Sequence, residues 1–417
     1  MSLTVVNATL DGQRAGVHAE DGTIVELGPR VRPRAGDEVV DADGTAIVPG
    51  LVNGHTHAAM TLFRGHGDDL PLMRWLQEVV WPVEARLDEE DVYWGTRLAC
   101  LEMIRTGTLR FWDMYWHPAA TVRAVEDAGI RATVSAPLVD VGAAARRDGI
   151  PQMAKRSLEE IGEARALVAP ALGPHAIYTV SEQGLRWVGE ASAERDLPIH
   201  IHVSETEDEV ARCVADHGAR PAEYLDRLGV LGPRTLLAHG AWLDESELAL
   251  VAERGSTIVT NPVANLKLAI GRVFPYRAVR RHGIPVGLGT DGAGSNDSLD
   301  LLSDVKVLAL VQKHEARDPS VLPAEEAWRI ATGRDAPLLG AAGQIEEGRP
   351  ADFLLVRTDT PELGVGDFVA DLVYAASGSV VDTAVVNGKV LMRGGVVEGA
   401  EGVLAKASER CARLGLE

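Results

Sequence analysis

Residues 49–57 read PGLVNGHTH and carry the pattern on which the fold assignment depends, an apolar run that ends in two histidines one residue apart. The apolar part predicts a buried strand. Because side chains of extended backbone alternate between two faces, His55 and His57 project from the same side at the end of this strand. Two imidazoles so placed can bind one cation. Alone the pair is weak evidence, because histidines are often satisfied by hydrogen bonds or solvent instead.

Short apolar runs alternate with segments of helical periodicity over residues 108–290, which is typical of βα units around a parallel sheet. Helices are expected at 181–196, 244–254 and 275–282. Seven later strands, together with the strand in residues 49–57, make eight, the number in a closed (β/α)₈ TIM-type barrel of an α/β protein. The seven are expected near 109–113, 130–136, 168–172, 198–203, 235–239, 256–260 and 284–289.

The two ends of the chain differ from its middle, because both show short alternating strands broken by turn pairs. Apart from the last twenty residues of the chain, neither end shows a helical pattern. Neither end is large enough to be stable alone, so we expect them to pair into a small β-sandwich beside the barrel. Residues 1–49 and 343–417 then form a composite β-domain with a helix near 401–414, and residues 50–342 form the barrel. The turn pairs, at which we expect hairpins, are Asp21-Gly22, Asp43-Gly44 and Asn387-Gly388.

The composition limits the classes of protein to which the chain can belong. Hydrophobic residues make up 46% of its 417 residues and charged residues 24%, which is ordinary for a globular protein. The 61 acidic against 41 basic residues give a formal net charge of −20, which repels phosphate backbones and anionic membranes. We therefore expect a small-molecule substrate and no nucleic acid or membrane partner, while homo-oligomer formation stays open.

Only three cysteines occur, Cys100, Cys213 and Cys411, and they lie far apart in the sequence. Their odd number and their spacing argue against a disulfide framework and a CxxC motif. The first twenty residues lack an unbroken apolar segment, and nowhere do 18 apolar residues run together. These features predict a reducing, cytoplasmic location without a secretion signal or a membrane span.

Further candidate metal ligands occur where the later strands end. His175 lies just past the fourth strand, His202 and His239 end the fifth and sixth, and Asp291 follows the eighth. Side chains at the C-terminal ends of barrel strands converge on one cavity. Three or four histidines with one carboxylate match the ligand preferences of zinc or iron. His200 shares a strand face with His202, but His202 lies nearer the barrel mouth, so we assign His202 as the ligand and His200 to the layer beneath or behind it.

Glu205 follows His202 by three residues, at the point where the chain leaves the strand. A carboxyl group there can face a substrate bound over the metal, so Glu205 is our candidate proton shuttle. The alternative is an acid in the first turn of a helix, which is the interpretation we give to Glu207, Asp208 and Glu209. Spacing alone leaves both interpretations of Glu205 open.

Residues 287–292, GLGTDG, formally match the GxGxxG pattern of dinucleotide-binding proteins. The match lies late in the chain, contains Asp291 and has no early βαβ unit around it, which argues against a dinucleotide site. We expect the glycines to permit a tight turn that brings the Asp291 carboxylate to the metal.

Together these motifs resemble the amidohydrolase superfamily and, within it, the branch of chlorohydrolases and aminohydrolases that includes 5′-methylthioadenosine/S-adenosylhomocysteine deaminases. The resemblance spans nearly the whole chain. It implies one divalent metal, zinc before iron, held by His55, His57, His202 and Asp291, with His239 beside the bound water. The residues that carry it are 49–57, 173–175, 200–205, 238–240, 261–262, 265–268 and 289–292.

The resemblance implies hydrolytic deamination of a 6-aminopurine nucleoside, in which metal-activated hydroxide attacks the carbon bearing the exocyclic amine. Asp291 then accepts the proton of the water, Glu205 protonates the ring nitrogen and His239 stabilises the oxygen. By the same resemblance Glu84 binds the ribose hydroxyls and His175 contacts the purine. Trp75 lies in the same segment as Glu84, which we expect over the barrel mouth.

The chain departs from this branch where relatives that accept S-adenosylhomocysteine have two arginines for its carboxylate. By our alignment Ala136 and Asp148 stand there, and Arg146 and Arg147 are candidates to replace them. We therefore expect 5′-methylthioadenosine, 5′-deoxyadenosine or adenosine as better substrates than S-adenosylhomocysteine. The alternative is a deaminase or dechlorinase of another heterocycle, of guanine, pterin, cytosine or triazine type, for which Glu84 has no ribose to bind. A barrel kept only as a binding scaffold is disfavoured, because all proposed ligands are present.

Overall fold

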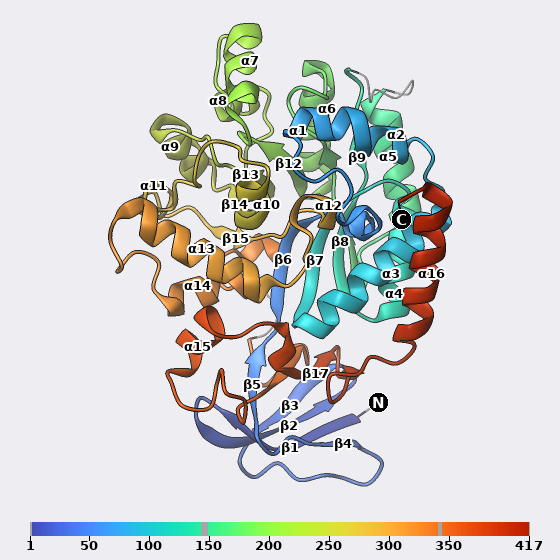
Figure 1. Cartoon of the computed structure of the whole chain (residues 1–417), viewed down its shortest axis with the longest axis vertical. Helices are drawn as coiled ribbons and strands as arrows, with labels where there is room; N and C mark the ends of the chain where they lie inside the picture. The colour runs from blue at the N-terminus through green and yellow to red at the C-terminus, as the bar shows by residue number, and fades with distance from the viewer. Residues whose placement is uncertain (1, 143–148, 341–343, 417) are drawn as a thin grey trace.

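The structure is a computed structural model that describes residues 2–142, 149–340 and 344–416. Figure 1 shows strands surrounded by helices in the upper part of the molecule and a separate sheet below them, next to the N-terminus. The chain begins in the lower sheet, enters the upper part through β5 (Thr45–Pro49) and β6 (Leu51–Thr56), and returns to the lower sheet near its end. The two parts are therefore joined by several crossings of the backbone.

Eight parallel strands form the upper part, in two sheets with the orders β10-β8-β7-β6 and β12-β13-β14-β15. A parallel bridge between Leu172 and Ile199 joins the sheets on one side. On the other side the Asp291 N–H donates to the His55 carbonyl at 3.0 Å. This ring order is consistent with the predicted (β/α)₈ barrel, and the predicted strands are confirmed to within two residues at each end. After β6 they are β7 (Thr108–Met114), β8 (Arg131–Ser135), β10 (Val168–Pro170), β12 (Ile199–Val203), β13 (Thr235–His239), β14 (Thr257–Thr260) and β15 (Val286–Leu288).

Helices follow the strands and cover their outer side, and local capping explains where several begin and end. Asp88 and Asp91 form a capping box at the start of α3, and Gly107 ends that helix in the left-handed conformation. The predicted helices at 181–196, 244–254 and 275–282 are confirmed as α6, α9 and α11. The helices of this part are α3 (Glu89–Thr106), α4 (Pro118–Ala128), α5 (Ile150–Ile161), α6 (Glu182–Arg195), α7 (Glu207–His217), α8 (Pro221–Arg227), α9 (Glu245–Arg254), α10 (Pro262–Lys267), α11 (Tyr276–Arg281), α12 (Ala293–Asn296), α13 (Leu301–Ala316) and α14 (Ala324–Ala331).

Strands from both ends of the chain share one eight-stranded sheet, with the order β18-β17-β16-β5-β1-β2-β3 and with β4 paired to β1. The junction is the antiparallel pair of β5 with β16, so pairing between the two ends is confirmed. The sandwich form expected for this β-domain and the expected domain boundaries remain predictions. Besides β5, the strands are β1 (Ser2–Leu10), β2 (Gln13–Glu20), β3 (Thr23–Gly28), β4 (Glu38–Asp41), β16 (Phe353–Arg357), β17 (Val381–Val386) and β18 (Lys389–Met392).

The predicted turns in this sheet are of two kinds. Asp21-Gly22 joins β2 to β3, and Asn387-Gly388 joins β17 to β18, each as a hairpin with positive φ at both turn residues. Asp43-Gly44 connects β4 to β5, but both of these strands pair in parallel with β1. The hairpin expected at Asp43-Gly44 is therefore wrong, because strands that lie parallel beside a common neighbour are not each other's antiparallel partners.

Two helices near the C-terminus differ from expectation. The helix predicted at 401–414 is present as α16 (Ala400–Leu414), but it packs against α3 of the barrel part and runs beside it in Figure 1. Arg413 bonds to Asp91 there, which the grouping of this helix with the terminal strands did not anticipate. A short helix, α15 (Phe368–Tyr374), also interrupts a segment expected to hold strands only.

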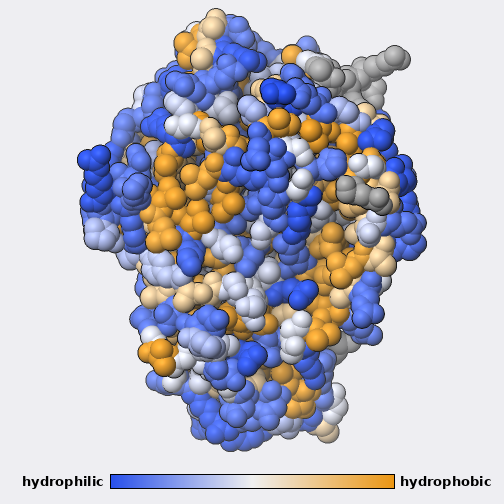
Figure 2. Space-filling model, viewed as in Figure 1, coloured by the Kyte–Doolittle hydropathy of each residue, from blue (hydrophilic) through white to orange (hydrophobic). Residues whose placement is uncertain are grey.

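The surface is mostly polar, as Figure 2 shows for one face, with apolar residues gathered in separate patches between hydrophilic ones. In the described part of the chain, no helix has both the length and the apolar character needed to cross a membrane.

A buried ion pair connects the barrel part to the shared sheet. The Arg131 guanidinium on β8 donates to the Asp352 carboxylate at 2.5 and 2.9 Å, and both residues are less than a tenth exposed. The same carboxylate accepts the Asn387 N–H at 2.7 Å, in the turn between β17 and β18. Asp352 therefore holds the barrel and the terminal hairpin together.

We expect Arg131→Met to destabilise the protein by about 3–5 kcal/mol, because it leaves a buried carboxylate without its hydrogen-bonding cation. The double variant Arg131→Met/Asp352→Leu should recover much of this loss, since both charges are then absent. Urea denaturation measures the change, with Arg357→Met as the control because its partner Asp359 is solvent-exposed. Equal midpoints for Arg131→Met and this control would contradict the role of the ion pair.

Candidate active site

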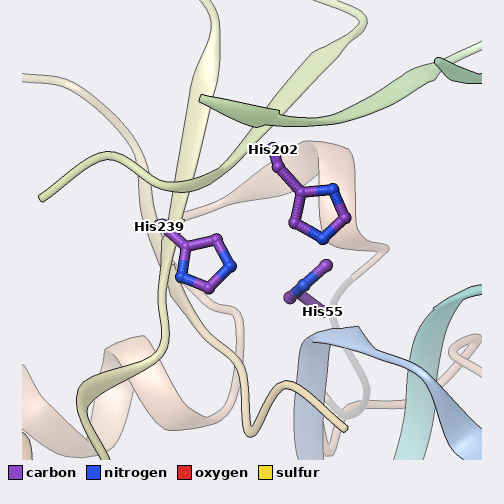
Figure 3. A group of neighbouring side chains, drawn as sticks. All are labelled: His55, His202 and His239. Carbon is purple, nitrogen blue, oxygen red and sulfur yellow. The ribbon is translucent and has the colours of Figure 1, made fainter. Parts of the chain in front are cut away.

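Four histidines at the C-terminal ends of three strands turn their Nε2 atoms toward one point. His55 and His57 come from the end of β6, His202 from β12 and His239 from β13. Nε2 of His202 lies 3.3 Å from Nε2 of His57. Ligand atoms of His55, His202 and His239 lie within 4.8 Å of one another, and Figure 3 shows these three imidazoles facing a common centre. The barrel thus gathers side chains that are up to 184 positions apart in the sequence.

Asp291 completes this cluster. Its Oδ1 lies 3.3 Å from Nε2 of His55 and 3.3 Å from Nε2 of His57. Its Oδ2 accepts a hydrogen bond from Ser295 at 2.7 Å, which fixes the carboxylate. Three histidines and one carboxylate with a fourth histidine beside them form the donor set of a divalent metal site. The residues therefore support a bound divalent cation.

The second ring nitrogen of each histidine is held by a hydrogen bond. Nδ1 of His57 donates to the Met114 carbonyl at 2.7 Å, and Nδ1 of His202 donates to the His175 carbonyl at 2.7 Å. Nδ1 of His239 lies 2.9 Å from Oδ1 of Asn265. A proton held on Nδ1 leaves the Nε2 lone pair free, which is the arrangement that a metal-binding imidazole requires.

His200 plays the corresponding part for His55. Its Nε2 lies 2.7 Å from Nδ1 of His55, while Nε2 of His55 is buried with no hydrogen-bond partner among the described residues. A buried nitrogen without a partner costs free energy unless a ligand satisfies it. His200 thus lies behind His55, in one of the two places expected for it, and does not face the centre.

The charge state of the cluster fits a cation at its centre. Burial lowers the pKa of His55 to about 3, and burial with the neighbouring imidazoles holds the pKa of His202 well below its ordinary value. Although burial acts in the opposite direction, Asp291 raises the pKa of His57 to about 9. His55 and His57 in turn hold the pKa of Asp291 well below its ordinary value, against the effect of burial. A dication can take the place of the proton on His57, because metal ligation requires neutral imidazole.

Close backbone approach, more than a tight turn, explains the glycines around Asp291. A Cβ atom on Gly289 would lie 2.3 Å from Oδ1 of Asn261 and 2.9 Å from the His55 carbonyl oxygen, so only glycine fits there. The positive φ of this segment, 63°, belongs to Asp291 itself. The Asp291 carboxylate reaches the histidine cluster, as expected. The glycines allow this by leaving room for neighbouring atoms, and not by adopting a positive φ.

Glu205 is 6% exposed and lies two residues after the end of β12, beside the histidine cluster. Its Oε1 lies 3.9 Å from Nε2 of His239. Glu209 accepts the backbone N–H groups of Ser204 and Glu205 at 2.8 Å each, which fixes the backbone at this position. Burial raises the pKa of Glu205, which favours the protonated form that a proton donor needs. Helix α7 begins only at Glu207, with Thr206 as its cap, so Glu205 lies outside the first turn.

A cavity opens over the cluster, and three of the predicted substrate contacts line it: Glu84, His175 and Trp75. The segment expected over the barrel mouth forms its roof as α1 (Leu72–Trp75), η2 (Leu76–Val80) and α2 (Trp81–Glu84). Trp75 is fixed by a hydrogen bond from its indole N–H to the His66 carbonyl at 3.1 Å. Arg146, Arg147 and Asp148 lie outside the described residues.

Some residues of the site have no motif that marks them in the sequence. Ser295, which fixes Asp291, and Asn265, which faces His239, are ordinary polar residues, although Asn265 lies within a run that carried the resemblance. Two of the hydrogen bonds to histidines go to backbone carbonyls, which any residue supplies. Tyr115 also lines the cavity and was not selected, because a single tyrosine after a strand has no distinctive spacing.

The amidohydrolase family model matches residues 46–391 of the chain. The chain belongs to the amidohydrolase family. This amidohydrolase is 48% identical over 404 residues to a 5′-deoxyadenosine deaminase of Methanoregula boonei, in a match that covers 95% of this chain and 91% of that protein. It is 43% identical over 383 residues to 5-methylthioadenosine/S-adenosylhomocysteine deaminase 1 of Archaeoglobus fulgidus, covering 91% of this chain and 90% of that one.

A solved structure agrees with this assignment. This amidohydrolase superposes on an adenosine deaminase from Xanthomonas campestris with bound zinc, with a TM-score of 0.92 and 33% identity. The match covers 100% of this chain and 99% of the other. The predicted family membership is thereby confirmed, and with it the assignment of the chain as a hydrolase.

We expect His200→Leu to lower the metal affinity of this amidohydrolase roughly 10–100-fold, because His55 loses the partner that orients its ring. His200→Gln keeps an oxygen near the position of Nε2 and should retain most of the affinity. Competition with a chromophoric chelator measures the affinity, and metal analysis should give one ion per chain for the wild type. An exposed histidine, His314 on α13, gives the control His314→Ala. If His200→Leu binds metal as tightly as this control, the support of His55 by His200 is not needed.

Proposed function

We propose that this amidohydrolase deaminates the 6-amino group of an adenine nucleoside by hydrolysis and releases ammonia. The observation that carries the proposal is the combination of the histidine–Asp291 cluster with a buried acid, Glu205, at the wall of one cavity. The deaminase relatives support the same reaction, since their matches span more than nine tenths of this chain. The reaction converts the purine amine into a lactam.

The donor set His55, His57, His202 and Asp291 would hold the metal, and a bound divalent cation lowers the pKa of a water molecule from about 15.7 toward ~7. Asp291 accepts the proton that the attacking water loses. His239, whose Nδ1 lies near Asn265, directs its Nε2 toward the attacking oxygen and stabilises the negative charge that develops there.

Glu205 supplies the second proton transfer. Hydrolytic loss of the amine requires a proton on the ring nitrogen next to the attacked carbon. This proton neutralises the negative charge that develops on the nitrogen when the oxygen attacks. The raised pKa of the buried Glu205 keeps a proton available for that transfer. The proton that Asp291 took from the water then passes to the departing amine, so that ammonia leaves as a neutral molecule. As the carbonyl forms, the proton of the new hydroxyl group returns to Glu205.

Glu84 and His175 orient the substrate in this proposal. Glu84 ends α2 in the roof of the cavity and would accept hydrogen bonds from the sugar hydroxyls. His175 follows the fourth strand and would contact the purine, while Trp75 contributes an apolar surface to the roof. In an adenosine-type nucleoside bound this way, the purine would lie near the histidine cluster and the sugar would lie near the roof of the cavity.

Several finer features belong to the same proposal. We favour zinc over iron, because the histidine-rich set suits zinc and the relative from Xanthomonas campestris holds it. We favour 5′-deoxyadenosine, 5′-methylthioadenosine or adenosine over S-adenosylhomocysteine, because Ala136 has no charge to bind a carboxylate. The proposal also includes closure of the strands as a TIM-type barrel and a β-sandwich formed by residues 1–49 and 343–417. A cytoplasmic location is part of it as well.

Glu205→Gln should lower kcat for 5′-deoxyadenosine by about 10²–10⁴-fold while metal content stays at the wild-type level, because the amide cannot donate the proton. Ultraviolet absorbance during conversion of the aminopurine to the lactam measures the rate. Its neighbour Glu207 is exposed on the first turn of α7, so Glu207→Gln is the matched control and should keep the wild-type rate. Retained turnover in Glu205→Gln would refute the proton-transfer role.

Glu84→Ala should reduce kcat/KM for 5′-deoxyadenosine at least tenfold, since hydrogen bonds to a carboxylate contribute about 1.5–3 kcal/mol. Activity on the free base adenine, which has no sugar, should be unchanged or absent in both proteins. The measurement is ammonia release from each substrate by wild type and variant. An unaffected nucleoside rate would favour the alternative, a deaminase or dechlorinase of another heterocycle.

A further inference from the structure

Glu209 carries a buried carboxylate with an unusual set of partners at the start of α7. It is the third residue of this helix, after the capping residue Thr206, and it is 5% exposed. In a capping box, the acid at this position accepts the backbone N–H of the capping residue. The Glu209 carboxylate reaches further back along the chain, and its two oxygens accept the N–H groups of Ser204 and Glu205 at 2.8 Å each.

Ser204 adopts a backbone conformation that is uncommon for a residue other than glycine. Its φ is 51°, in the left-handed region, and the residue is fully buried. Hydrogen bonds hold it on both sides, because its N–H donates to Glu209 and its carbonyl accepts the Trp242 N–H at 2.8 Å. Such a conformation persists only where the surrounding structure holds it, so these two bonds stabilise the bend at Ser204.

The bend at Ser204 decides to which side Glu205 points. Side chains of extended backbone alternate, so a strand continued beyond Val203 would place Glu205 on the face of Val203, opposite to His202. The histidine cluster lies on the side of His202. With the bend, Glu205 lines the cavity, and its Oε1 lies 3.9 Å from Nε2 of His239. The left-handed residue therefore brings the acid to the side of the cluster.

Glu209 does not itself form part of the cavity wall. The described residues that line the cavity include Glu205 but not Glu209. Both carboxylate oxygens of Glu209 accept backbone N–H groups and face the chain just before α7. Any effect of Glu209 on the reaction therefore passes through the residues whose backbone it binds.

We propose that Glu209 is a positioning residue whose carboxylate stabilises the bend at Ser204 and thereby directs the Glu205 carboxyl group toward the substrate. This inference rests on the proposed function, in which Glu205 protonates the ring nitrogen, and adds to it the residue that sets the position of the acid. Glu209 acts on the proton-transfer step and not on the binding of nucleoside or metal.

The test begins with Glu209→Gln, which keeps the size of the side chain but replaces one acceptor oxygen with an NH₂ donor. At most one of the two backbone N–H groups then keeps its acceptor. We expect kcat for 5′-deoxyadenosine to fall roughly ten- to hundredfold, because the acid is misplaced. KM should stay within twofold of wild type, and metal content should not change. In crystals of the variant, Oε1 of Glu205 should lie further than 3.9 Å from Nε2 of His239.

A double-mutant cycle separates positioning of Glu205 from a general loss of structure. The Glu205→Gln background already lacks the proton donor, so adding Glu209→Gln should change kcat less than twofold. The same factor of loss in both backgrounds would mean that Glu209 acts independently of Glu205, and this result would overturn the inference.

Asp300→Asn is the matched control, because Asp300 is also a buried carboxylate at the start of a helix and accepts two backbone N–H groups. The donors are Leu302 at 3.0 Å and Gly378 at 2.8 Å, and Asp300 is not among the described residues that line the cavity. This variant should keep the wild-type kcat and KM. Thermal midpoints check that all variants are folded.

Three further results would overturn the role of Glu209: an unchanged kcat in Glu209→Gln, an equal loss of kcat in Asp300→Asn, or an unmoved Glu205 carboxylate in crystals of Glu209→Gln. If the wild type releases no ammonia from 5′-deoxyadenosine, 5′-methylthioadenosine or adenosine, the proposed function fails. The position of Glu205 in the crystals then decides alone whether Glu209 sets it.

Discussion

The site depends on the hydrogen bonds that hold the Nδ1 atoms of its histidines. A free imidazole can rotate and can carry its proton on either nitrogen, so a convergent set of Nε2 lone pairs does not arise from proximity alone. Here the Met114 and His175 carbonyls, the Asn265 side chain and His200 each fix one ring. With the rings fixed, the cation is the group that completes the arrangement.

One helix connects this arrangement to the roof of the cavity. Helix α10 contributes Asn265, which faces His239, and two residues later Lys267, which pairs with Asp68 at 2.8 Å and also with Asp297. Asp297 in turn accepts the Gly65 N–H at 3.0 Å. The loop that leads into the roof and the side chain of His239 are therefore held by the same short helix. The roof covers the cavity above the histidine cluster, and electrostatic interactions strengthen where water is displaced from such a cavity.

The sequence was sufficient for the parts of this structure that follow from periodicity and from strand ends. The (β/α) pattern located the parallel strands, and the convergence of strand ends predicted that residues as distant as His55 and Asp291 would meet. The packing of α16 on α3 was not predictable, because its amphipathic pattern identifies an apolar face but not its partner. The anchors at Met114 and His175 were not predictable either, because they are backbone carbonyls.

The most direct test of the central claim is anomalous diffraction from crystals of the zinc-loaded protein. We expect one anomalous peak per chain, about 2.0–2.2 Å from Nε2 of His55, His57 and His202 and from a carboxylate oxygen of Asp291. His200 should remain behind His55 without contact to the peak. Two peaks about 3.5–4 Å apart, or one peak outside the histidine cluster, would contradict a single cation held by these four residues.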